Sequence, residues 1–409
     1  MGVLPSEKKA ACNGGFTSAY VSCSSFAASL VVDGACIPRW SSLSPASACF
    51  LMTPVPAAFR LAVMTPGGKD GRQLFPDGAG TLESPGHAPV NFHAYAACTR
   101  GVYLSGDSLP EEQHVLLLIG SKMERAEVML RRLKDAGKTV VITIKETGLP
   151  QIAGHFQNFT NWSRFKRLCH LADGALATTF DTEPLYSAAN PKLPVAFIPP
   201  PYPVEEVDWD VSKQILLPQR GIFLGTRQLF VASRNHALAL TLLAPVAEAI
   251  NEPITVISGR ASDLPPMKRL INKVADFSLR WHQNFAAQSA SMQIITRQLR
   301  AVDYLKLMAA HKLVFQLDQS SVPGQVAGDA LMCRLPCVGG NGTAERLVFP
   351  DLCGHGRSTG ELLYITRRLL SDEGYRAEQV QRSVALAQEK MSFSSVRKQL
   401  ETFFLSPAV

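Results

Sequence analysis

The side chains best placed for chemistry lie in residues 323–347, PGQVAGDALMCRLPCVGGNGTAERL. One carboxylate, Asp329, falls inside an apolar run that otherwise has the pattern of a buried helix, and glycines recur on both sides of that run. A purely structural corner between a strand and a helix needs one or two glycines, whereas a loop that lets a ligand touch the backbone needs several. We therefore expect a ligand site in this segment.

The elements around Asp329 support this expectation. The apolar run KLVFQLD predicts a strand, and Pro323 and Gly324 then open a predicted helix over residues 325 to 334. In an open parallel sheet, ligands bind beyond the carboxyl ends of the strands, where the first N–H groups of a helix can hold a phosphate. Asp329 lies one turn inside this helix, where it could accept hydrogen bonds from two neighbouring hydroxyls of a ribose or hexose. The alternative is that it faces water or favours the helix dipole.

Alternating strands and helices along most of the chain predict an α/β protein with parallel sheets. A cluster of prolines at residues 199 to 203 marks a boundary, because successive prolines continue neither helix nor sheet. The chain is long enough for two domains. The predicted parts are an irregular extension rich in Ser, Ala, Gly and Pro, two Rossmann-like domains and a closing helix, over residues 1–95, 96–200, 201–390 and 391–409.

Composition limits the classes of partner. The net charge is +7, but Lys and Arg are scattered without the basic run that a nucleic-acid surface would show. The nine cysteines include no CxxC pair, which indicates reduced thiols in a cytoplasmic protein and no metal site. No apolar run reaches the length of a membrane helix. The positive balance suits an anionic small ligand or an anionic membrane surface, so we expect a cytoplasmic protein or one bound peripherally at the inner face of a membrane.

The segment from Asp329 to Val338 resembles the donor site of retaining nucleotide-sugar glycosyltransferases with the GT-B fold, which consists of two facing Rossmann domains. Their pattern is Glu, seven residues, Glu, then Ala-x-Ala-x-Gly-x-Pro-Val, and Asp329 stands in place of the second Glu. The resemblance implies that Asp329 contacts the ribose of the donor. Ser321 occupies the position of the first Glu, and Gly324 that of the family's loop glycine. Glu345 resembles an acid that often follows the next strand, although it could also be a plain carboxylate at a helix N-terminus.

A second segment, FLGTRQLFVASRNHALAL, resembles the strand, loop and basic residues that open the C-terminal domain of the family. The resemblance implies that Arg227 and Arg234 contact the donor diphosphate; the alternative is that each is a solvated charge. On the acceptor side the family commonly ends a strand with His, where this chain has Lys145 and Glu146. Glu146 could act as the catalytic base, or it could form an ion pair with Lys145.

The resemblance predicts a glycosyltransferase that moves a sugar from a nucleotide-diphosphate donor to a glycan, lipid-linked or small-molecule acceptor, in polysaccharide or glycoconjugate synthesis. It implies no cofactor and no metal, because arginine side chains and helix-end amides would neutralise the departing diphosphate. Ser321 favours an alternative, a catalytically inactive GT-B-like partner that binds glycan or protein. A nucleotide-sugar epimerase would need His and acidic residues suited to proton abstraction, and the sequence shows no such set.

Overall fold

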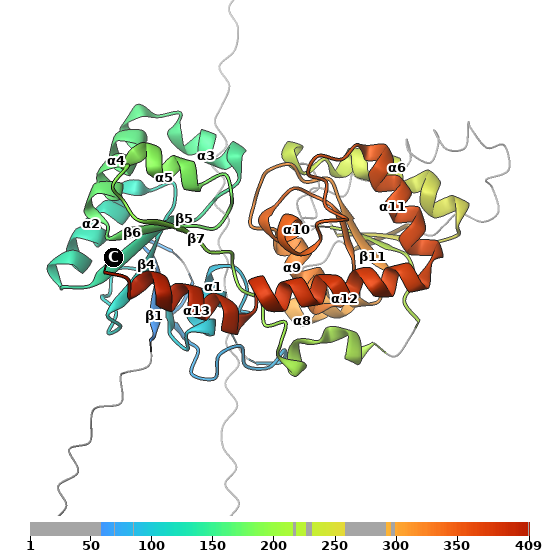
Figure 1. Ribbon diagram of the computed structural model, residues 1–409, viewed down its shortest axis with the longest axis horizontal. Coiled ribbons are helices and arrows are strands. Elements are labelled where there is room, and N and C mark those ends of the chain that lie inside the picture. The colour runs from blue at the N-terminus through green and yellow to red at the C-terminus, as the bar shows by residue number, and fades with distance from the viewer. Residues whose placement is uncertain are drawn as a thin grey trace, which may run out of the picture. The chain divides into compact units, whose positions relative to one another are not determined.

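The computed structural model describes residues 59–68, 70–84, 86–215, 218–225, 231–257, 292–295, 299–407 and 409 (Figure 1). These residues belong to one compact unit that extends from Ala57 to Val409 and contains two sheets. The predicted Arg227 lies outside the described residues. No helix within the described ranges has the length and apolarity to cross a membrane.

The N-terminal sheet has the strand order β2-β3-β1-β4-β5-β6-β7. Its strands are β1 (Leu61–Thr65), β2 (Gln73–Leu74), β3 (Val102–Ser105), β4 (His114–Ile119), β5 (Thr139–Ile144), β6 (Gly174–Ala177) and β7 (Val195–Phe197). All pairings are parallel except that of β2 with β3. Strands β4 and β5 are continuous apolar runs with buried side chains, as a parallel sheet covered on both faces requires.

The predicted irregular extension over residues 1–95 is wrong where β1 and β2 lie and where α1 (Phe92–Cys98) begins. Strand β1 is fully buried in the sheet, where Ala62 pairs with Val102 on one side and Leu61 pairs with His114 on the other. Strand β1 has only five residues, and the segment after it is rich in Gly and Pro and shows no sustained helical or strand period. The sequence therefore carried little periodic signal for a strand at this position. The N-terminal domain therefore begins before residue 61.

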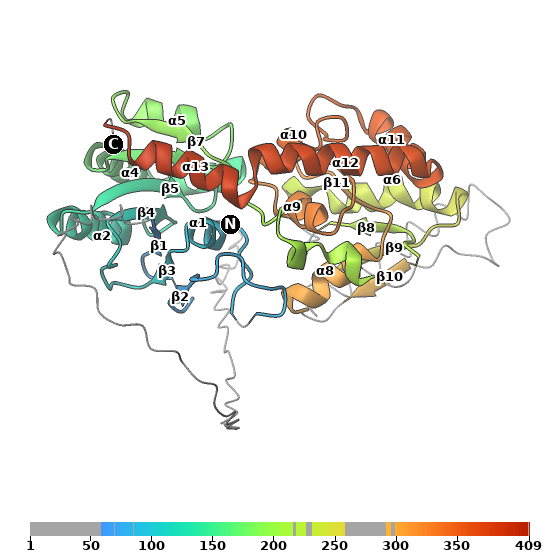
Figure 2. The same ribbon diagram turned by 60° about the horizontal axis from the view of Figure 1, so that its bottom comes forward.

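Helices cover both faces of this sheet (Figures 1 and 2). One face carries α2 (Met123–Asp135), α3 (Leu149–Phe156), α4 (Phe159–Leu171) and α5 (Glu183–Ala189), whose apolar side chains form one core with β1, β4 and β5. The other face carries α1 (Phe92–Cys98) and α13 (Phe393–Phe404), which pack together. Phe404 at the end of α13 contacts the rings of Phe59 and His114. The last helix of the chain thus completes the core of the N-terminal sheet.

The C-terminal sheet is parallel throughout, with the strand order β10-β9-β8-β11-β12. Its strands are β8 (Ile222–Leu224), β9 (Ile254–Ile257), β10 (Met292–Ile295), β11 (Leu313–Gln316) and β12 (Cys337–Gly339). Its helices are α6 (His236–Ala249), α8 (Ala301–Ala309), α9 (Gln325–Met332), α10 (Thr343–Val348), α11 (Thr359–Ser371) and α12 (Glu373–Lys390). Helix α11 packs with α6 and β12, and α9 packs with α8 and α12. The chain reverses its direction of winding between β8 and β11, which is where ligands bind in such sheets.

The proline-rich segment after β7 is tied to the end of the chain. Tyr202 donates its backbone N–H to Met391 O at 2.8 Å, just before α13 begins. The ring of Tyr202 is buried against Gly328 in α9, where an added Cβ would overlap the ring. Gly328 therefore permits close packing of α9 on this segment. The domain boundary at residue 201 stays a prediction.

Candidate active site

Two loops at the carboxyl edge of the C-terminal sheet are joined by their backbones. Asn341 after β12 donates its N–H to Asp318 O at 3.1 Å, and Thr343 donates to Val322 O at 2.9 Å. In return, Ser321 donates its N–H to Asn341 Oδ1 at 3.1 Å. Ser321 has a φ of 53° and Gly324, which caps α9, a φ of 88°, so two residues of the β11–α9 loop adopt the left-handed conformation. The loop shape is fixed by these bonds before any ligand enters.

Glu345, on α10, points its carboxyl group between these loops. Gln316 Nε2 donates to Glu345 Oε1 at 2.6 Å, and Glu345 Oε2 has no hydrogen-bond partner among the described residues. Burial raises the pKa of Glu345 to about 7, and the nearby Asp318 carboxylate adds to the rise. A Cβ on Gly324 would overlap Glu345 Oε2, and one on Gly342 would lie 2.5 Å from the same atom. The two glycines accordingly leave room for this carboxyl group.

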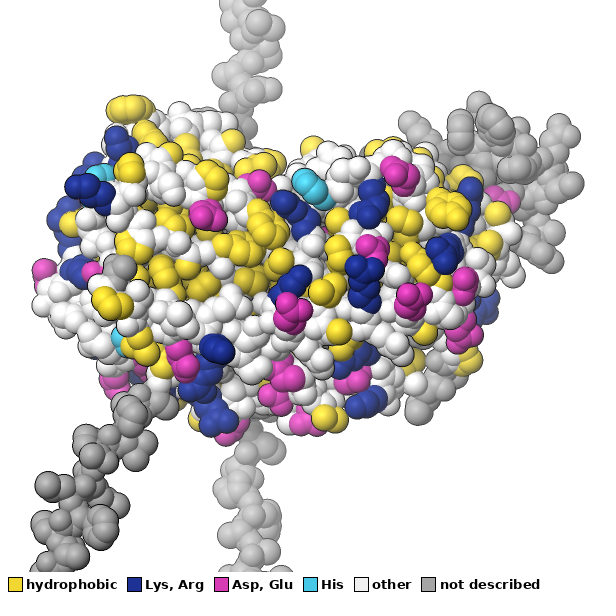
Figure 3. All heavy atoms as spheres, in the orientation of Figure 1, with side chains coloured by type: hydrophobic (Ala, Val, Ile, Leu, Met, Phe, Trp, Pro, Cys, Tyr) yellow, Lys and Arg dark blue, Asp and Glu magenta, His cyan; other side chains and the backbone are white. Residues whose placement is uncertain are grey.

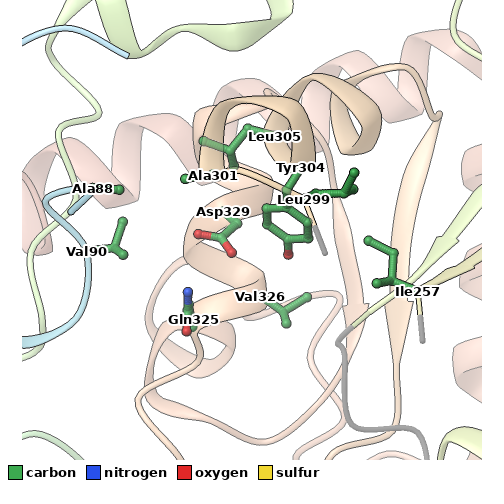
Figure 4. A pocket seen from close by; sticks show the side chains of 10 residues that line it. All are labelled: Ala88, Val90, Ile257, Leu299, Ala301, Tyr304, Leu305, Gln325, Val326 and Asp329. Carbon is green, nitrogen blue, oxygen red and sulfur yellow. The ribbon is translucent and has the colours of Figure 1, made fainter. Parts of the chain in front are cut away.

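Asp329, on α9, lines a cavity of about 170 Å³ (Figure 4). It is only 3% exposed, so the alternative that it faces water is wrong. Figure 4 shows its carboxylate beside Tyr304 and Val326, in a cavity whose other lining residues are Ala88, Val90, Ile257, Leu299, Ala301, Leu305 and Gln325. An apolar wall with one carboxylate at its edge has the chemistry that a nucleoside requires, with a flat base on one side and a diol on the other.

Arg234 is brought to the same edge of the sheet from the loop after β8. Its Nε lies 3.7 Å from Asp318 Oδ2, and its side chain is 23% exposed. Two neighbours secure the contact, since Gln319 N donates to Ser233 O at 2.8 Å and Asn235 Nδ2 donates to Leu317 O at 3.1 Å. Arg234 is thus a partly buried, paired cation.

Glu146 lies at the carboxyl edge of the N-terminal sheet, after β5. Its Oε2 lies 3.1 Å from His155 Nε2, on α3, and among the described residues no ion pair joins it to Lys145. The predicted alternative of a Lys145–Glu146 pair is therefore wrong. The Glu146 side chain is 40% exposed and that of His155 is 14% exposed, so the carboxylate is the more accessible partner.

The loops of the two sheets touch beside these residues. Leu149, at the start of α3, donates its N–H to Ser320 O at 2.9 Å, next to Ser321. Thr343 Oγ1 donates to Thr178 O at 3.2 Å, after β6. Glu146 is three residues from Leu149, a separation that a fully extended chain spans in about 11 Å. The structure therefore brings Glu146 and Ser321 to one region, while Asp329 lies one helical turn further along.

A group of residues that the sequence did not indicate lies close enough to Lys145 for its charge to act on them. The ring of His93, on α1, stacks on that of Tyr103 with 3.7 Å between the centroids, and Tyr103 Oη lies 3.5 Å from Asp70 Oδ2. Burial lowers the pKa of His93 to about 4, with His87 and Lys145 contributing. His93 Nε2 is buried without a partner among the described residues. The signal that could have found them is the short apolar helix pattern FHAYAAC, which spans the predicted end of the extension at residue 95.

Comparisons with known proteins establish the fold. No protein-family model and no curated protein match the sequence. Among solved structures, sucrose-phosphate synthase from Thermosynechococcus elongatus superimposes with a TM-score of 0.53 at 13% identity, over 84% of this chain and 98% of that one. The UDP-forming α,α-trehalose-phosphate synthase from Burkholderia xenovorans gives 0.54 at 12% identity, over 73% of this chain and 75% of that one. The trehalose-6-phosphate protein from E. coli, solved with bound UDP-2-fluoroglucose, gives 0.52 at 11% identity, over 72% and 73%. These proteins are GT-B glycosyltransferases, and the prediction of two Rossmann-like domains in the GT-B arrangement is thereby confirmed.

Proposed function

We propose that the protein is a glycosyltransferase that binds a nucleotide-diphosphate sugar at the loops of the C-terminal sheet and transfers the sugar to an acceptor at the edge of the N-terminal sheet. The observation that carries the proposal is the cavity beside α9, where Asp329 is buried at the rim of an apolar wall. The GT-B fold supports it, as does the UDP-2-fluoroglucose bound to one structural neighbour.

In this proposal the cavity holds the base of the donor and Asp329 accepts hydrogen bonds from the ribose hydroxyls. The first free N–H groups of α9 and the guanidinium of Arg234 face the diphosphate, and Arg227 is proposed to join them. The sugar lies near Ser321 and Glu345. Charged hydrogen bonds from arginine and helix-end amides hold the leaving group, so the proposal requires neither a metal nor a cofactor.

The proposed reaction is a displacement at the anomeric carbon. An acceptor hydroxyl oxygen forms the new bond to that carbon, and the bond from the carbon to the diphosphate oxygen breaks, with its electron pair leaving on the nucleoside diphosphate. Glu146 takes the proton of the hydroxyl. Its 40% exposed carboxylate, near the β11–α9 loop, supports this assignment.

The test uses purified protein with UDP-, GDP- and ADP-linked hexoses. Calorimetry measures the affinity for each, and release of the nucleoside diphosphate measures turnover with a panel of hexoses, hexose phosphates and lipid-linked sugars as acceptors. We expect one nucleotide class to bind and to be consumed. If none of these nucleotide sugars binds, the proposal is wrong.

Ser321 favours a second candidate, a catalytically inactive partner that binds nucleotide sugar or glycan. Where the glycosyltransferase pattern has a carboxylate, Ser321 is 7% exposed and its hydroxyl lies 3.5 Å from Asn341 Nδ2. A neutral hydroxyl makes weaker hydrogen bonds to a sugar than a carboxylate does. This candidate predicts nucleotide binding without turnover, and activity gained by Ser321→Glu would identify a decayed enzyme.

We further propose that any contact with a membrane is made by the outer surface of α2 and α4. Figure 3 shows Lys and Arg side chains over these helices, at the left of the view. Arg131, Lys166 and Arg167 line a shallow open pocket there. This cationic surface suits anionic headgroups. The test is cosedimentation with vesicles containing phosphatidylglycerol, where Lys166→Glu is expected to weaken binding and equal binding by both proteins would contradict the assignment.

A further inference from the structure

We infer that His155 is a positioning residue for the acceptor-side carboxylate: it holds Glu146 in the orientation that receives the attacking hydroxyl. This inference rests on the proposed function. It concerns a residue that belongs to neither of the two sequence segments that resemble the glycosyltransferase family.

The first step is the geometry of the pair. The 3.1 Å separation between His155 Nε2 and Glu146 Oε2 is a hydrogen-bond distance, and it leaves Glu146 Oε1 for another donor. The glutamate is the more exposed of the two, at 40% against 14% for the histidine. A solvent-exposed Glu has several rotamers of similar energy, whereas one bonded through Oε2 to a mostly buried ring is confined to few of them.

The second step is the rigidity of the element that carries His155. At its start, the N–H of the N-cap residue Gly148 donates to Gln151 Oε1 at 3.2 Å. At its end, Asn161 Nδ2 donates to the carbonyl oxygen of His155 at 2.9 Å. The histidine is therefore held by its own helix and by the start of the next one. Glu146 lies outside α3, in the loop between β5 and α3, so His155 is its link to a fixed element.

The third step is the direction in which the pair faces. Glu146 Oε2 would lie 3.8 Å from a Cβ added to Gly120, which follows β4, so the carboxylate lies over the carboxyl ends of β4 and β5. That edge is where an open parallel sheet binds its ligand. The same α3 donates Leu149 N–H to Ser320 O, in the loop proposed to hold the donor sugar. One helix thus sets the position of Glu146 relative to that loop.

The experiment compares His155→Leu, His155→Gln and Glu146→Gln with the wild type, using the nucleotide sugar and acceptor that give the fastest wild-type transfer. Loss of one positioning contact in an active site lowers the rate by roughly 10-fold to 100-fold. We expect that fall in kcat for His155→Leu, with the nucleotide-sugar Kd unchanged within about twofold. His155→Gln is expected to restore most of the rate, because its amide N–H can replace the ring Nε2–H as a donor.

The matched control is His170→Leu, on α4. His170 is exposed and its Nδ1 lies 2.7 Å from Lys166 O of its own helix, so its removal tests for a general effect of losing a surface histidine. It should leave both kcat and the nucleotide-sugar Kd unchanged. In the double variant Glu146→Gln, His155→Leu, the second change should add nothing to the first, a coupling that a purely structural role would not show.

The outcomes separate the two proposals. A wild-type protein that binds none of the nucleotide sugars overturns the proposed function. A wild-type protein that binds a nucleotide sugar but neither transfers nor hydrolyses it has no reaction in which His155 could position Glu146. That result overturns this inference. The inference is also overturned if His155→Leu transfers at the wild-type rate, if Gln restores no more activity than Leu, or if the effects of the two substitutions are additive. Thermal melts of each variant identify losses due to unfolding.

Discussion

The loops of the C-terminal sheet and the edge of the N-terminal sheet contribute to the proposed site in different ways. Around Ser321 and Gly324, backbone hydrogen bonds between two loops fix the shape, and the acids Asp329 and Glu345 are almost completely buried. Around Glu146, side chains contact one another across elements and remain partly exposed. The first region is built before a ligand binds, whereas the second depends on a few side-chain contacts. The first should therefore be the more sensitive to changes in the backbone.

The largest effect is expected from Gly324→Ala. A non-glycine residue at a φ of 88° costs about 1–2 kcal/mol, and the added Cβ would also overlap Glu345 Oε2. With the overpacking included, we expect a total loss of roughly 3 kcal/mol in the free energy of unfolding, together with loss of nucleotide binding.

The control for this prediction is Gly356→Ala. Gly356 has a φ of 73°, but a Cβ there would meet nothing within 4 Å, so only the backbone cost remains. Urea unfolding of both variants measures the difference. Equal losses would show that the packing of Gly324 against Glu345 contributes nothing to stability.

The second prediction concerns pH and Glu345. Its pKa in the folded protein is about 7, above the usual 4.5 of a glutamate, so the folded state binds the proton more tightly than the unfolded state does. The stability that this proton provides is complete below pH 4.5 and is lost as the pH rises to 7. A shift of this size corresponds to roughly 3 kcal/mol.

Glu345→Gln has no proton to lose and should remove this dependence. Between pH 4.5 and pH 8, the wild type should lose about 3 kcal/mol in the free energy of unfolding relative to the variant. The free energy of unfolding in urea, measured at several pH values, checks the difference. Curves for variant and wild type that stay parallel from pH 4.5 to 8 would mean that the carboxyl group is not strained by burial.

The sequence predicted the loop between β11 and α9 better than the edge of the N-terminal sheet, for physical reasons. Ser321, Gly324 and Asp329 lie in one continuous strand–loop–helix segment, so local periodicity and turn chemistry suffice to bring them together. Glu146 and His155 are nine residues apart, and their contact depends on how α3 packs, which no local pattern specifies. The burial of Glu345 is likewise tertiary, because Gln316 on β11 and Gly324 before α9 contact its carboxyl group.

The third prediction separates the two regions by nucleotide affinity. Asp329→Asn keeps the shape of the side chain but removes its charge, and a hydrogen bond to a charged group contributes about 1.5–3 kcal/mol. We expect the Kd for the bound nucleotide sugar to rise roughly 10-fold to 100-fold. Glu146→Gln is the matched control, because the acceptor-side carboxylate should not affect donor affinity. Calorimetry that finds equal affinities for Asp329→Asn and the wild type would refute the ribose contact.

The smallest effect, opposite in sign to that of Glu345, is expected at His93 on the N-terminal sheet. Burial lowers its pKa from 6.5 to about 4, so the folded state binds a proton less tightly than the unfolded state and this stability is lost as the pH falls from 6.5 toward 4. His93→Phe keeps a ring stacked on Tyr103 but does not titrate. Between pH 7 and pH 5 the wild type should therefore lose roughly 1–2 kcal/mol relative to the variant. The Glu345→Gln variant should show the same loss of stability on protonation of His93, because this substitution lies on α10, beside the C-terminal sheet. If His93→Phe and the wild type lose stability equally between pH 7 and 5, His93 is not buried in its neutral form. This edge of the N-terminal sheet is then more open to solvent than the contacts of His93 with Tyr103 and Phe75 indicate.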